Sequence, residues 1–204
     1  MTTRGEDRRE KILDVAQRIV LQKGFTGTSI EEIIEQSFIT KGGFFYHFKG
    51  KTELAKRLLE RYLEQDEAFF RMLFDRADEL SEDPLQQMLI FLKLYAEAMN
   101  DLPGVHPGCL VAAYTYESQQ FDDEIKQLAA EGMLSWRSLF AQRLAAIAER
   151  YPMKIETPLT ELADMLTSVI EGSIVMSRVL QRNAILGQQL MQYRAYIRIL
   201  FGDA

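Results

Sequence analysis

The segment Thr40-Lys41-Gly42-Gly43-Phe44-Phe45-Tyr46-His47-Phe48 decides how the N-terminal part of the chain is organised. Thr40 is a good helix N-cap, because its hydroxyl can accept a hydrogen bond from a free backbone N–H of the first turn. Phe44 and Phe48 are spaced i and i+4, so they share one helix face and would anchor it to a core. The segment therefore predicts a short helix whose remaining side chains point outward.

The outer side of this helix has the composition of a surface that reads DNA. Lys41 projects from the helix start, where contacts with bases and phosphates usually arise, and Tyr46 and His47 lie nearer the outside. Gly42 and Gly43 each cost about 1 kcal/mol of helix stability relative to alanine, but their small size lets the backbone approach a phosphate or a base edge. The alternative is a surface helix held only by its phenylalanines.

Two further helices are expected immediately before this segment. Residues 9–23 carry an apolar stripe and end at Gly24-Phe25, a glycine after the last turn followed by a hydrophobic residue. Residues 28–37 begin with a capping box, in which Thr28 caps the helix and Glu31 lies three residues on. Three helices within about forty residues, the last two joined by a tight turn, form the helix-turn-helix arrangement, whose second helix enters the major groove.

The order and spacing of several motifs resemble the TetR family of transcriptional repressors. These motifs run from Lys11-Ile12-Leu13-Asp14 to Gly24-Phe25, then through Thr28-Ser29-Ile30 and Thr40-Lys41-Gly42, and from Tyr46-His47-Phe48 to Lys51. Beyond residue 60 the resemblance is one of length and helical pattern. The residues expected to contact double-stranded DNA are Thr28, Ser29, Thr40, Lys41, Gly42, Gly43, Phe45, Tyr46, His47 and Lys51.

Two positions depart from the pattern of this family. Phe38 stands in the turn where members usually have glycine, and a bulky residue in a left-handed conformation costs roughly 1–2 kcal/mol. Phe45 stands where members commonly have a tyrosine that binds a DNA phosphate, and Tyr46 is its neighbour. These departures keep open the alternative of a dimeric ligand-binding protein of the same fold without operator binding.

The composition fits a two-domain protein. The chain has 204 residues, 47% of them hydrophobic, which is enough for a sizeable core. We expect a DNA-binding domain at residues 1–50 and an effector-binding and dimerisation domain at residues 51–204. No run approaches the ~18 apolar residues of a membrane span, and the charged N-terminus lacks the apolar core of a secretory signal. The protein is therefore expected in the cytoplasm, without a membrane partner.

The net charge of −6 is unevenly distributed along the chain. Residues 1–53 hold nine Lys and Arg against eight Asp and Glu, whereas the remainder holds 15 against 22. DNA binding would therefore depend on the local placement of cations; ordinary solvated surface charge is the alternative for each of them. The candidates are Lys41, Lys49 and Lys51, and the arginines of the N-terminal arm, Arg4, Arg8 and Arg9.

The rest of the chain predicts helices and gives no strand signal. A long helical pattern covers residues 51–80, the proline at position 84 starts another helix, and residues 101–108 form the clearest loop. Helices are then expected at 109–117, 122–151, 158–183 and 187–201. The predicted fold class is all-α with about nine helices, in which a three-helix helix-turn-helix domain precedes a larger helical domain.

A homodimer is predicted from the mechanism. One helix-turn-helix reads only a few base pairs, so specificity calls for two copies about one helical turn of DNA apart. We place the interface on the last two helices, where Gly172, Ser173 and Ser177 would allow close helix approach. Two such helices from each subunit would form a four-helix bundle, as in similar proteins. The predicted interface residues are Leu162, Leu166, Ile170, Ser173, Ser177, Ile197 and Leu200. The alternative is that these faces pack inside one subunit.

The resemblance also implies a small-molecule effector site among the middle helices of the second domain. Methionine adapts to irregular apolar shapes, and tyrosine combines an apolar body with a polar tip. The predicted lining is Met88, Leu92, Tyr95, Met99, Tyr114, Met133, Trp136 and Met165. Such residues at helical spacing are more often plain core, so the hypothesis is limited to a mostly apolar or aromatic effector.

Cys109 is the only cysteine, which excludes an intrachain disulfide framework and a zinc finger. It follows Pro107-Gly108 at an expected helix N-terminus, where the helix dipole favours a thiolate. Some members of the resembled family sense electrophiles through a cysteine, so Cys109 is a candidate redox sensor. A small buried hydrophobe is the alternative.

These features together predict a ligand-responsive transcriptional regulator. It would bind a palindromic operator as a dimer and repress, and a small, mostly apolar effector or modification of a cysteine would release it. An enzyme is not expected, because the sequence has no nucleophile motif, phosphate-binding glycine loop or metal-ligand spacing. Its only histidines, His47 and His106, fall in different predicted domains. No cofactor or metal is expected.

Overall fold

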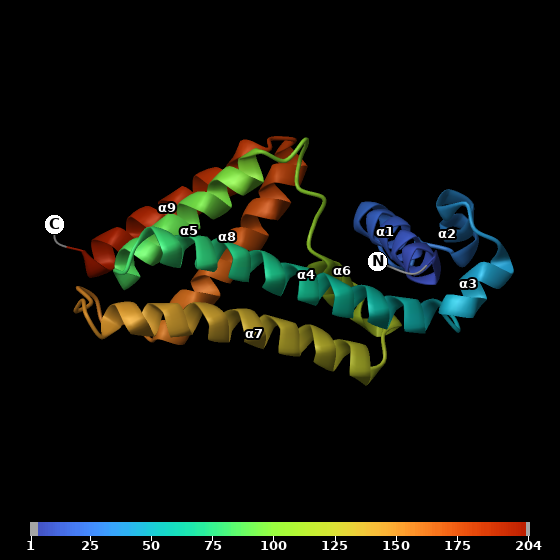
Figure 1. Cartoon of the computed structure of the whole chain (residues 1–204), viewed down its shortest axis with the longest axis horizontal. Helices are drawn as coiled ribbons and strands as arrows, with labels where there is room; N and C mark the ends of the chain where they lie inside the picture. The colour runs from blue at the N-terminus through green and yellow to red at the C-terminus, as the bar shows by residue number, and fades with distance from the viewer. Residues whose placement is uncertain (1–3, 203–204) are drawn as a thin grey trace. The chain divides into compact units, whose positions relative to one another are not determined.

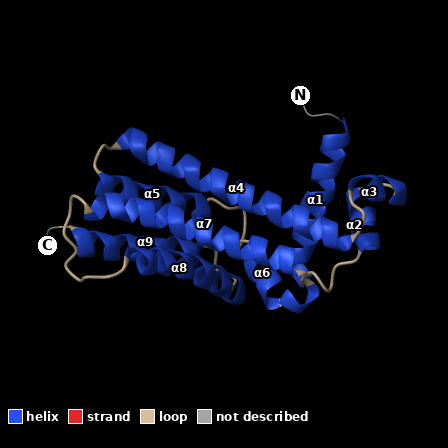
Figure 2. Ribbon diagram, turned by 90° about the horizontal axis from the view of Figure 1, so that it is seen from below, coloured by secondary structure: helices blue, strands red, loops and turns tan. Residues whose placement is uncertain are grey.

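The computed structural model describes residues 4–202, which form nine α-helices and one 3-10 turn without any strand (Figure 2). The elements are α1 (Arg4–Lys23), α2 (Ile30–Ser37), α3 (Lys41–His47), α4 (Lys51–Leu80), α5 (Pro84–Asn100), α6 (Leu110–Tyr116), η1 (Ser118–Gln120), α7 (Asp123–Ala148), α8 (Leu159–Leu180) and α9 (Ala184–Phe201). The predicted all-α fold is therefore confirmed. None of the described helices is long and apolar enough to cross a membrane.

The chain forms two compact units (Figure 1). The first contains the chain up to residue 65 together with residues 107–131, and the second contains residues 66–106 and those from 132 onward. The helices α4 and α7 therefore contribute to both units. The functional division that we expect after residue 50 stays a prediction.

The first unit is built on the apolar face of α1. Ile12, Ala16 and Ile19 recur at helical spacing and are buried, as are Phe44 and Phe48 at α3. Complete burial of an isoleucine or phenylalanine side chain contributes about 1.5–3 kcal/mol. The short helix α3 is therefore anchored by its two phenylalanines, as the sequence predicts.

Helix α2 begins differently from the prediction. Ser29 caps it, because the Ser29 hydroxyl accepts a hydrogen bond from the Glu32 N–H at 3.2 Å. Thr28 is buried and donates its hydroxyl to the Gly24 carbonyl oxygen at 2.7 Å. The predicted capping box of Thr28 and Glu31 is wrong, because the Thr28 hydroxyl closes the preceding turn instead.

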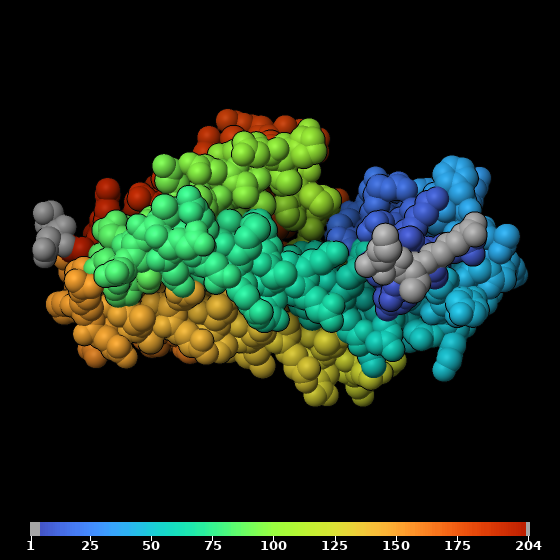
Figure 3. Space-filling view, in the orientation of Figure 1, coloured from blue at the N-terminus to red at the C-terminus, as the bar shows by residue number. Residues whose placement is uncertain are grey.

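The second unit is held together by aromatic side chains of α4, α5 and α7. The rings of Phe74 and Phe91 are stacked with their centroids 3.8 Å apart. Phe70 lies edge-on to Phe140 and Trp136, at centroid distances of 5.3 and 6.3 Å. Aromatic pairs of this kind contribute about 0.5–1.5 kcal/mol each beyond their burial. In the space-filling view, the side chains of α4 lie directly against those of α7 (Figure 3).

The last helix, α9, packs against both α5 and α8. The Tyr193 hydroxyl donates to the Leu162 carbonyl oxygen of α8 at 2.8 Å, and the Arg194 guanidinium donates to the Leu89 carbonyl oxygen of α5 at 2.8 Å. These bonds come from consecutive residues of α9. They fix α9 between its two neighbours.

Candidate nucleic-acid interface

Helix α3 has the cap that the sequence predicts. The Thr40 hydroxyl accepts a hydrogen bond from the Gly43 N–H at 3.1 Å, and the Thr40 backbone is extended, with φ −83° and ψ 158°. The helix ends at His47, and the backbone is extended again at Phe48. Helix α3 is therefore two turns long and is bounded by the extended residues Thr40 and Phe48.

The outer face of α3 is open to solvent. Lys41 is exposed, and Tyr46 is 83% exposed. Apart from Gly42 itself, its chain neighbours and the adjacent backbone of α3, no described atom lies within 4 Å of the position that a Cβ on Gly42 would take. A Cβ on Gly43 would instead lie 3.2 Å from the Thr40 hydroxyl oxygen. Gly42 therefore gives access to the backbone, whereas Gly43 also protects the helix cap.

Two adjacent aromatic residues on α3 differ in what they can bind. Phe45 packs edge-on against buried Phe44, with ring centroids 5.3 Å apart, and has no hydroxyl with which to bind a phosphate. The Tyr46 ring lies edge-on to His47, with centroids 5.0 Å apart. Because Tyr46 is exposed, its hydroxyl is accessible to an outside acceptor.

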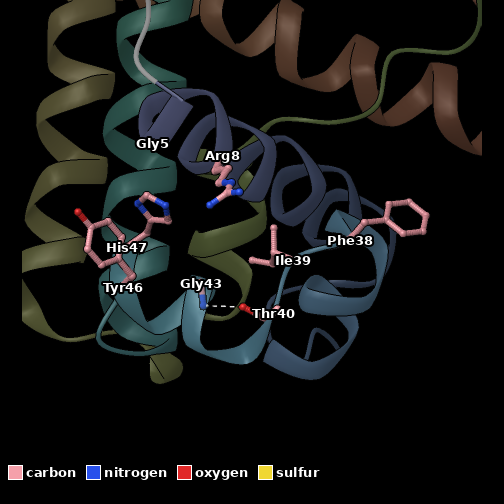
Figure 4. Close-up of a pocket in the computed structure, with 8 residues that line it drawn as sticks. All are labelled: Gly5, Arg8, Phe38, Ile39, Thr40, Gly43, Tyr46 and His47. Atoms are coloured by element: carbon pink, nitrogen blue, oxygen red, sulfur yellow. Dashed lines mark hydrogen bonds between the residues drawn. The ribbon is translucent and has the colours of Figure 1, made fainter.

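A cleft of about 580 Å³ opens beside α3 (Figure 4). Its lining consists of Gly5, Arg8, Phe38, Ile39, Thr40, Gly43, Tyr46 and His47. The Arg8 guanidinium and the His47 imidazole point toward each other from α1 and α3 (Figure 4). Arginine is the side chain best suited to binding a phosphate through paired N–H groups. The cleft can therefore accept an anion at the edge of α3.

The surroundings of His47 disfavour its protonated form. Burial lowers the pKa of His47, and the positive charges of Arg9 and Arg8 lower it further. A phosphate bound nearby would offset the arginine charges and favour the protonated imidazole. Arg8, expected only as part of a charged arm, is thus placed beside α3. The side chain of Arg4, from the same arm, lies outside the described residues.

Besides Thr40, which caps α3, three of the expected DNA-contacting residues have structural roles. Thr28 is buried, and the exposed Ser29 uses its hydroxyl to cap α2. The Lys51 ammonium donates to the Phe25 carbonyl oxygen at 2.6 Å and lies 4.2 Å from the centre of the Phe25 ring. Burial lowers the pKa of Lys51, and the charge of Glu117 acts in the opposite direction. Lys51 therefore fastens the α1–α2 loop.

Phe38 closes α2 in a left-handed conformation, with φ 56° and ψ 40°. The Ile39 N–H donates to the Ile34 carbonyl oxygen at 3.3 Å, a helix ending that usually requires glycine. For a residue with a side chain this conformation costs roughly 1–2 kcal/mol. The ring is 87% exposed, and the Lys11 ammonium lies 5.3 Å from its centre. The strain expected from the sequence is present, and burial of the ring does not offset it.

Glu117, which follows α6, fastens the loop between α1 and α2. Its carboxylate accepts hydrogen bonds from the Phe25 N–H at 2.8 Å, from the Thr26 N–H at 2.7 Å and from the Thr26 hydroxyl. Burial raises the pKa of Glu117, but these hydrogen bonds and the charge of Lys51 bring it below its usual value. Sequence reasoning missed Glu117, because its partners lie 91 and 92 residues away along the chain.

Tyr114, predicted to line the effector site, belongs to the first unit. Its ring lies edge-on to Phe25 and is stacked on Phe121, with centroids 5.9 and 4.3 Å away. Its hydroxyl donates to the Ala55 carbonyl oxygen at 3.0 Å, and burial raises the pKa of Tyr114. The polar tip that we expected to face an effector is instead bonded to the backbone of α4.

The other predicted effector residues lie in the second unit. The buried ones are Met88, Leu92, Tyr95, Met99 and Trp136. Met133 and Met165 are 37% and 39% exposed, so these two lie at the surface. The Tyr95 ring is edge-on to Phe69 and Phe70, with centroids 5.5 and 5.6 Å away. The structure therefore brings Tyr95 and Trp136 into one aromatic cluster through Phe70.

The predicted dimer-interface residues are buried inside the subunit. Leu162, Leu166, Ile170, Ser173, Ser177, Ile197 and Leu200 all belong to its interior. This prediction is wrong for these side chains, because they form the face of α8 and α9 that packs within the chain. A different set on α8 is exposed, except for the half-buried Val169, and we call it the α8 stripe: Met165, Val169, Gly172, Met176 and Val179.

Cys109 stands at the start of α6, as predicted. It is 5% exposed, and its sulfur accepts a hydrogen bond from the Ala112 N–H at 3.5 Å. The thiol is thus shielded from solvent and used as a helix cap. A reaction with an electrophile would require this part of the chain to open first.

Two family models match the chain. The one described as bacterial regulatory proteins of the tetR family matches residues 12–58, which hold most of α1 to α3 and the start of α4. The one described as the C-terminal domain of LmrA/YxaF-like transcriptional regulators matches residues 84–190. The second match alone spans more than half of the chain.

Individual relatives agree with these matches. The transcriptional regulator LmrA of Bacillus subtilis is 29% identical over 175 residues, which cover 84% of this chain and 86% of LmrA. The regulator YxaF of the same organism is 28% identical over 178 residues, 87% of each chain. A solved TetR-family structure from Agrobacterium tumefaciens covers 97% of this chain and 100% of that chain with a TM-score of 0.79, at 18% identity, which shows a shared fold. From the helix-turn-helix, the helical second unit and both family matches, the chain belongs to the TetR family of bacterial transcriptional regulators.

Proposed function

We propose that this protein is a repressor that binds a palindromic operator as a dimer and is released by a small, mostly apolar or aromatic effector. The observation that carries this proposal is the outer face of α3, where Lys41 and Tyr46 are exposed beside the cleft of Arg8 and His47. A bare helix start with cations beside it suits the major groove and its flanking phosphates. In this proposal Lys41 contacts base edges, and Arg8 and Tyr46 bind phosphates.

Selection of bound duplexes from a random DNA pool tests operator binding. We expect an inverted repeat with half-sites about one helical turn apart, and an affinity that falls steeply with salt because phosphates are neutralised. Lys41→Ala should weaken binding, whereas Lys93→Ala, which removes an exposed lysine of the second unit, should not. If folded protein recovers no preferred sequence, the alternative of a ligand-binding protein without operator function is favoured.

The α8 stripe supports the dimer. Its residues are spaced alternately four and three apart, the pattern by which two helices pack along a common seam. Apart from Gly172 itself, its chain neighbours and the adjacent backbone of α8, no described atom lies within 4 Å of a Cβ on Gly172, so a partner helix could approach the backbone there. We infer that this stripe packs against its counterpart in a second copy, in place of the buried residues predicted from the sequence.

Size-exclusion chromatography with light scattering tests the α8 stripe. Met176→Glu would place a charge from each subunit in the seam and is expected to give monomers at micromolar concentration. Leu134→Glu changes an exposed leucine of α7 outside the stripe and should remain dimeric. A monomeric wild type, or a Met176→Glu dimer as stable as the wild type, would contradict the interface.

The effector proposal rests on the aromatic cluster around Tyr95 and Trp136. An apolar or aromatic molecule entering this cluster would exchange ring contacts with Phe70 for its own, and it must bind the two conformations of the protein unequally to change DNA affinity. Trp136 is the only tryptophan, so its fluorescence reports binding directly. We expect compounds that quench the fluorescence of Trp136 also to release the protein from its operator. A compound that quenches the fluorescence without releasing the operator is not an effector. Because Cys109 is buried, modification of the cysteine is not part of this proposal.

A further inference from the structure

Phe38 combines backbone strain with an exposed ring, and nothing within the described fold offsets both. Among the described residues the other non-glycine residue with positive φ is Gln181, at the end of α8, with φ 52°. The Gln181 amide donates to the Arg178 carbonyl oxygen at 2.6 Å, so its side chain stabilises the helix end. The Phe38 ring instead stands in solvent against the Lys11 ammonium. Strained residues of this kind are found preferentially at functional sites.

The position of Phe38 points to the same partner as α3. It lines the cleft together with Thr40, Gly43 and Tyr46, and its ring points out from the turn, away from the helices behind it (Figure 4). Phe38 lies two residues before Thr40, the N-cap of α3, so its exposed ring stands next to the start of α3. The adjacent Lys11 ammonium supplies a cation beside the ring.

We propose that Phe38 is a specificity-determining residue whose ring packs against a thymine methyl group of the operator, while Lys11 binds the neighbouring phosphate. This inference rests on the proposed operator binding. The thymine C5-methyl is the apolar group that the major groove displays, and phenylalanine is among the side chains that contact it. A ring in that place also excludes water from the contact, which explains why an apolar side chain is held in a conformation that favours glycine.

The variant Phe38→Gly should change protein stability and operator affinity in opposite directions. Removing the strain should raise the melting temperature by roughly 2–4 °C, while loss of the ring should weaken operator binding about five- to tenfold. Phe38→Ala keeps a Cβ in the strained backbone and should lose a similar fraction of affinity, which excludes added flexibility of the turn as the cause. Gln181→Gly makes the same backbone change at the end of α8 and should leave DNA affinity unchanged.

Replacing operator thymines one at a time by deoxyuracil removes the methyl group alone. We expect one position per half-site to weaken wild-type binding to the level of Phe38→Ala, and the same change to have no further effect on that variant. Lys11→Ala should lower the slope of log affinity against log salt by about one, whereas Phe38→Ala should leave the slope unchanged.

The outcomes distinguish this inference from the proposed function. If the wild type binds no operator, operator binding itself fails. If the wild type binds and both Phe38 variants bind equally well, Phe38 makes no DNA contact and the inference is overturned. If the variants weaken binding but no deoxyuracil position does, the assignment to thymine is overturned.

Discussion

Replacing Glu117 by alanine should loosen the loop between α1 and α2 and destabilise the first unit. The carboxylate accepts two backbone hydrogen bonds, at 2.7 and 2.8 Å, and one from the Thr26 hydroxyl. A hydrogen bond to a charged group contributes about 1.5–3 kcal/mol. Because Glu117 is only partly buried, we expect a total loss of about 2–3 kcal/mol, well below the sum of the three. For a chain of this length that is a fall in Tm of roughly 5–10 °C.

Amide hydrogen exchange measures this loosening at the bonds themselves. The Phe25 and Thr26 amides lose their acceptor in Glu117→Ala, so their exchange should accelerate about thirtyfold or more, while amides of α9 should exchange as in the wild type. Glu124→Ala is the matched control, since this exposed carboxylate of the same unit pairs with Lys56 and should leave Tm near the wild-type value. Unchanged exchange at both amides, with unchanged Tm, would refute the role of Glu117.

The pH dependence of Tm gives a second, independent test of the role of the Glu117 carboxylate. The pKa of Glu117 lies below its usual value of 4.5 in the folded protein, so its contribution to stability is present above pH 4.5 and is lost as pH falls through the folded-state pKa. The difference in Tm between the wild type and Glu117→Gln should therefore be largest near neutral pH and should close in acid. A difference that persists in acid would mean that the charge of Glu117 is irrelevant.

Three other predictions follow from the first unit. Burial and the neighbouring arginines lower the pKa of His47 in the free protein, and a bound operator phosphate would raise it again. Operator affinity should therefore rise as pH falls toward this lowered pKa, and His47→Gln should remove most of the rise; equal pH profiles would contradict it. Lys51→Met keeps the packing over Phe25 but loses its hydrogen bond, so Tm should fall by a few degrees while the salt slope of DNA binding stays unchanged; a slope lowered by about one would make Lys51 a phosphate ligand. Cys109 should react with a thiol reagent far more slowly in native than in denatured protein, and Cys109→Ser should respond to the effector as the wild type does.

Helix positions could be predicted because local signals determine them. The range predicted for α4 coincides with the helix found, Lys51–Leu80. The helix predicted to start at Pro84 does so, capped by the Asp83 carboxylate, which accepts a hydrogen bond from the Gln86 N–H. Thr28 shows the limit of such signals, since Thr28 and Ser29 both carry hydroxyls that can cap, and tertiary burial of Thr28 decided between them.

The functional residues were predicted less well, because exposure depends on long-range packing. The sequence separates the buried from the outer side chains of α3, since i and i+4 spacing determines both. It could not show that α8 hides Leu162 and Leu166 and exposes Met176, because α8 is apolar on more than one side and its neighbours come from distant segments. The role of Glu117 could not be predicted either, because its hydrogen-bond partners, Phe25 and Thr26, come from a distant segment.

The first unit is discontinuous in the chain, because residues 107–131 complete it. A fragment ending near residue 65 would leave the Phe25 ring without Tyr114 and Phe121, and the loop amides without the Glu117 carboxylate. Anyone who exchanges the DNA-reading part of this protein for that of another regulator must therefore transplant two gene segments together. Matched pairs of segments should give well-folded chimaeras. A graft of the N-terminal segment alone would combine the α1–α2 loop of one protein with residues 107–131 of another, whose side chains do not match that loop.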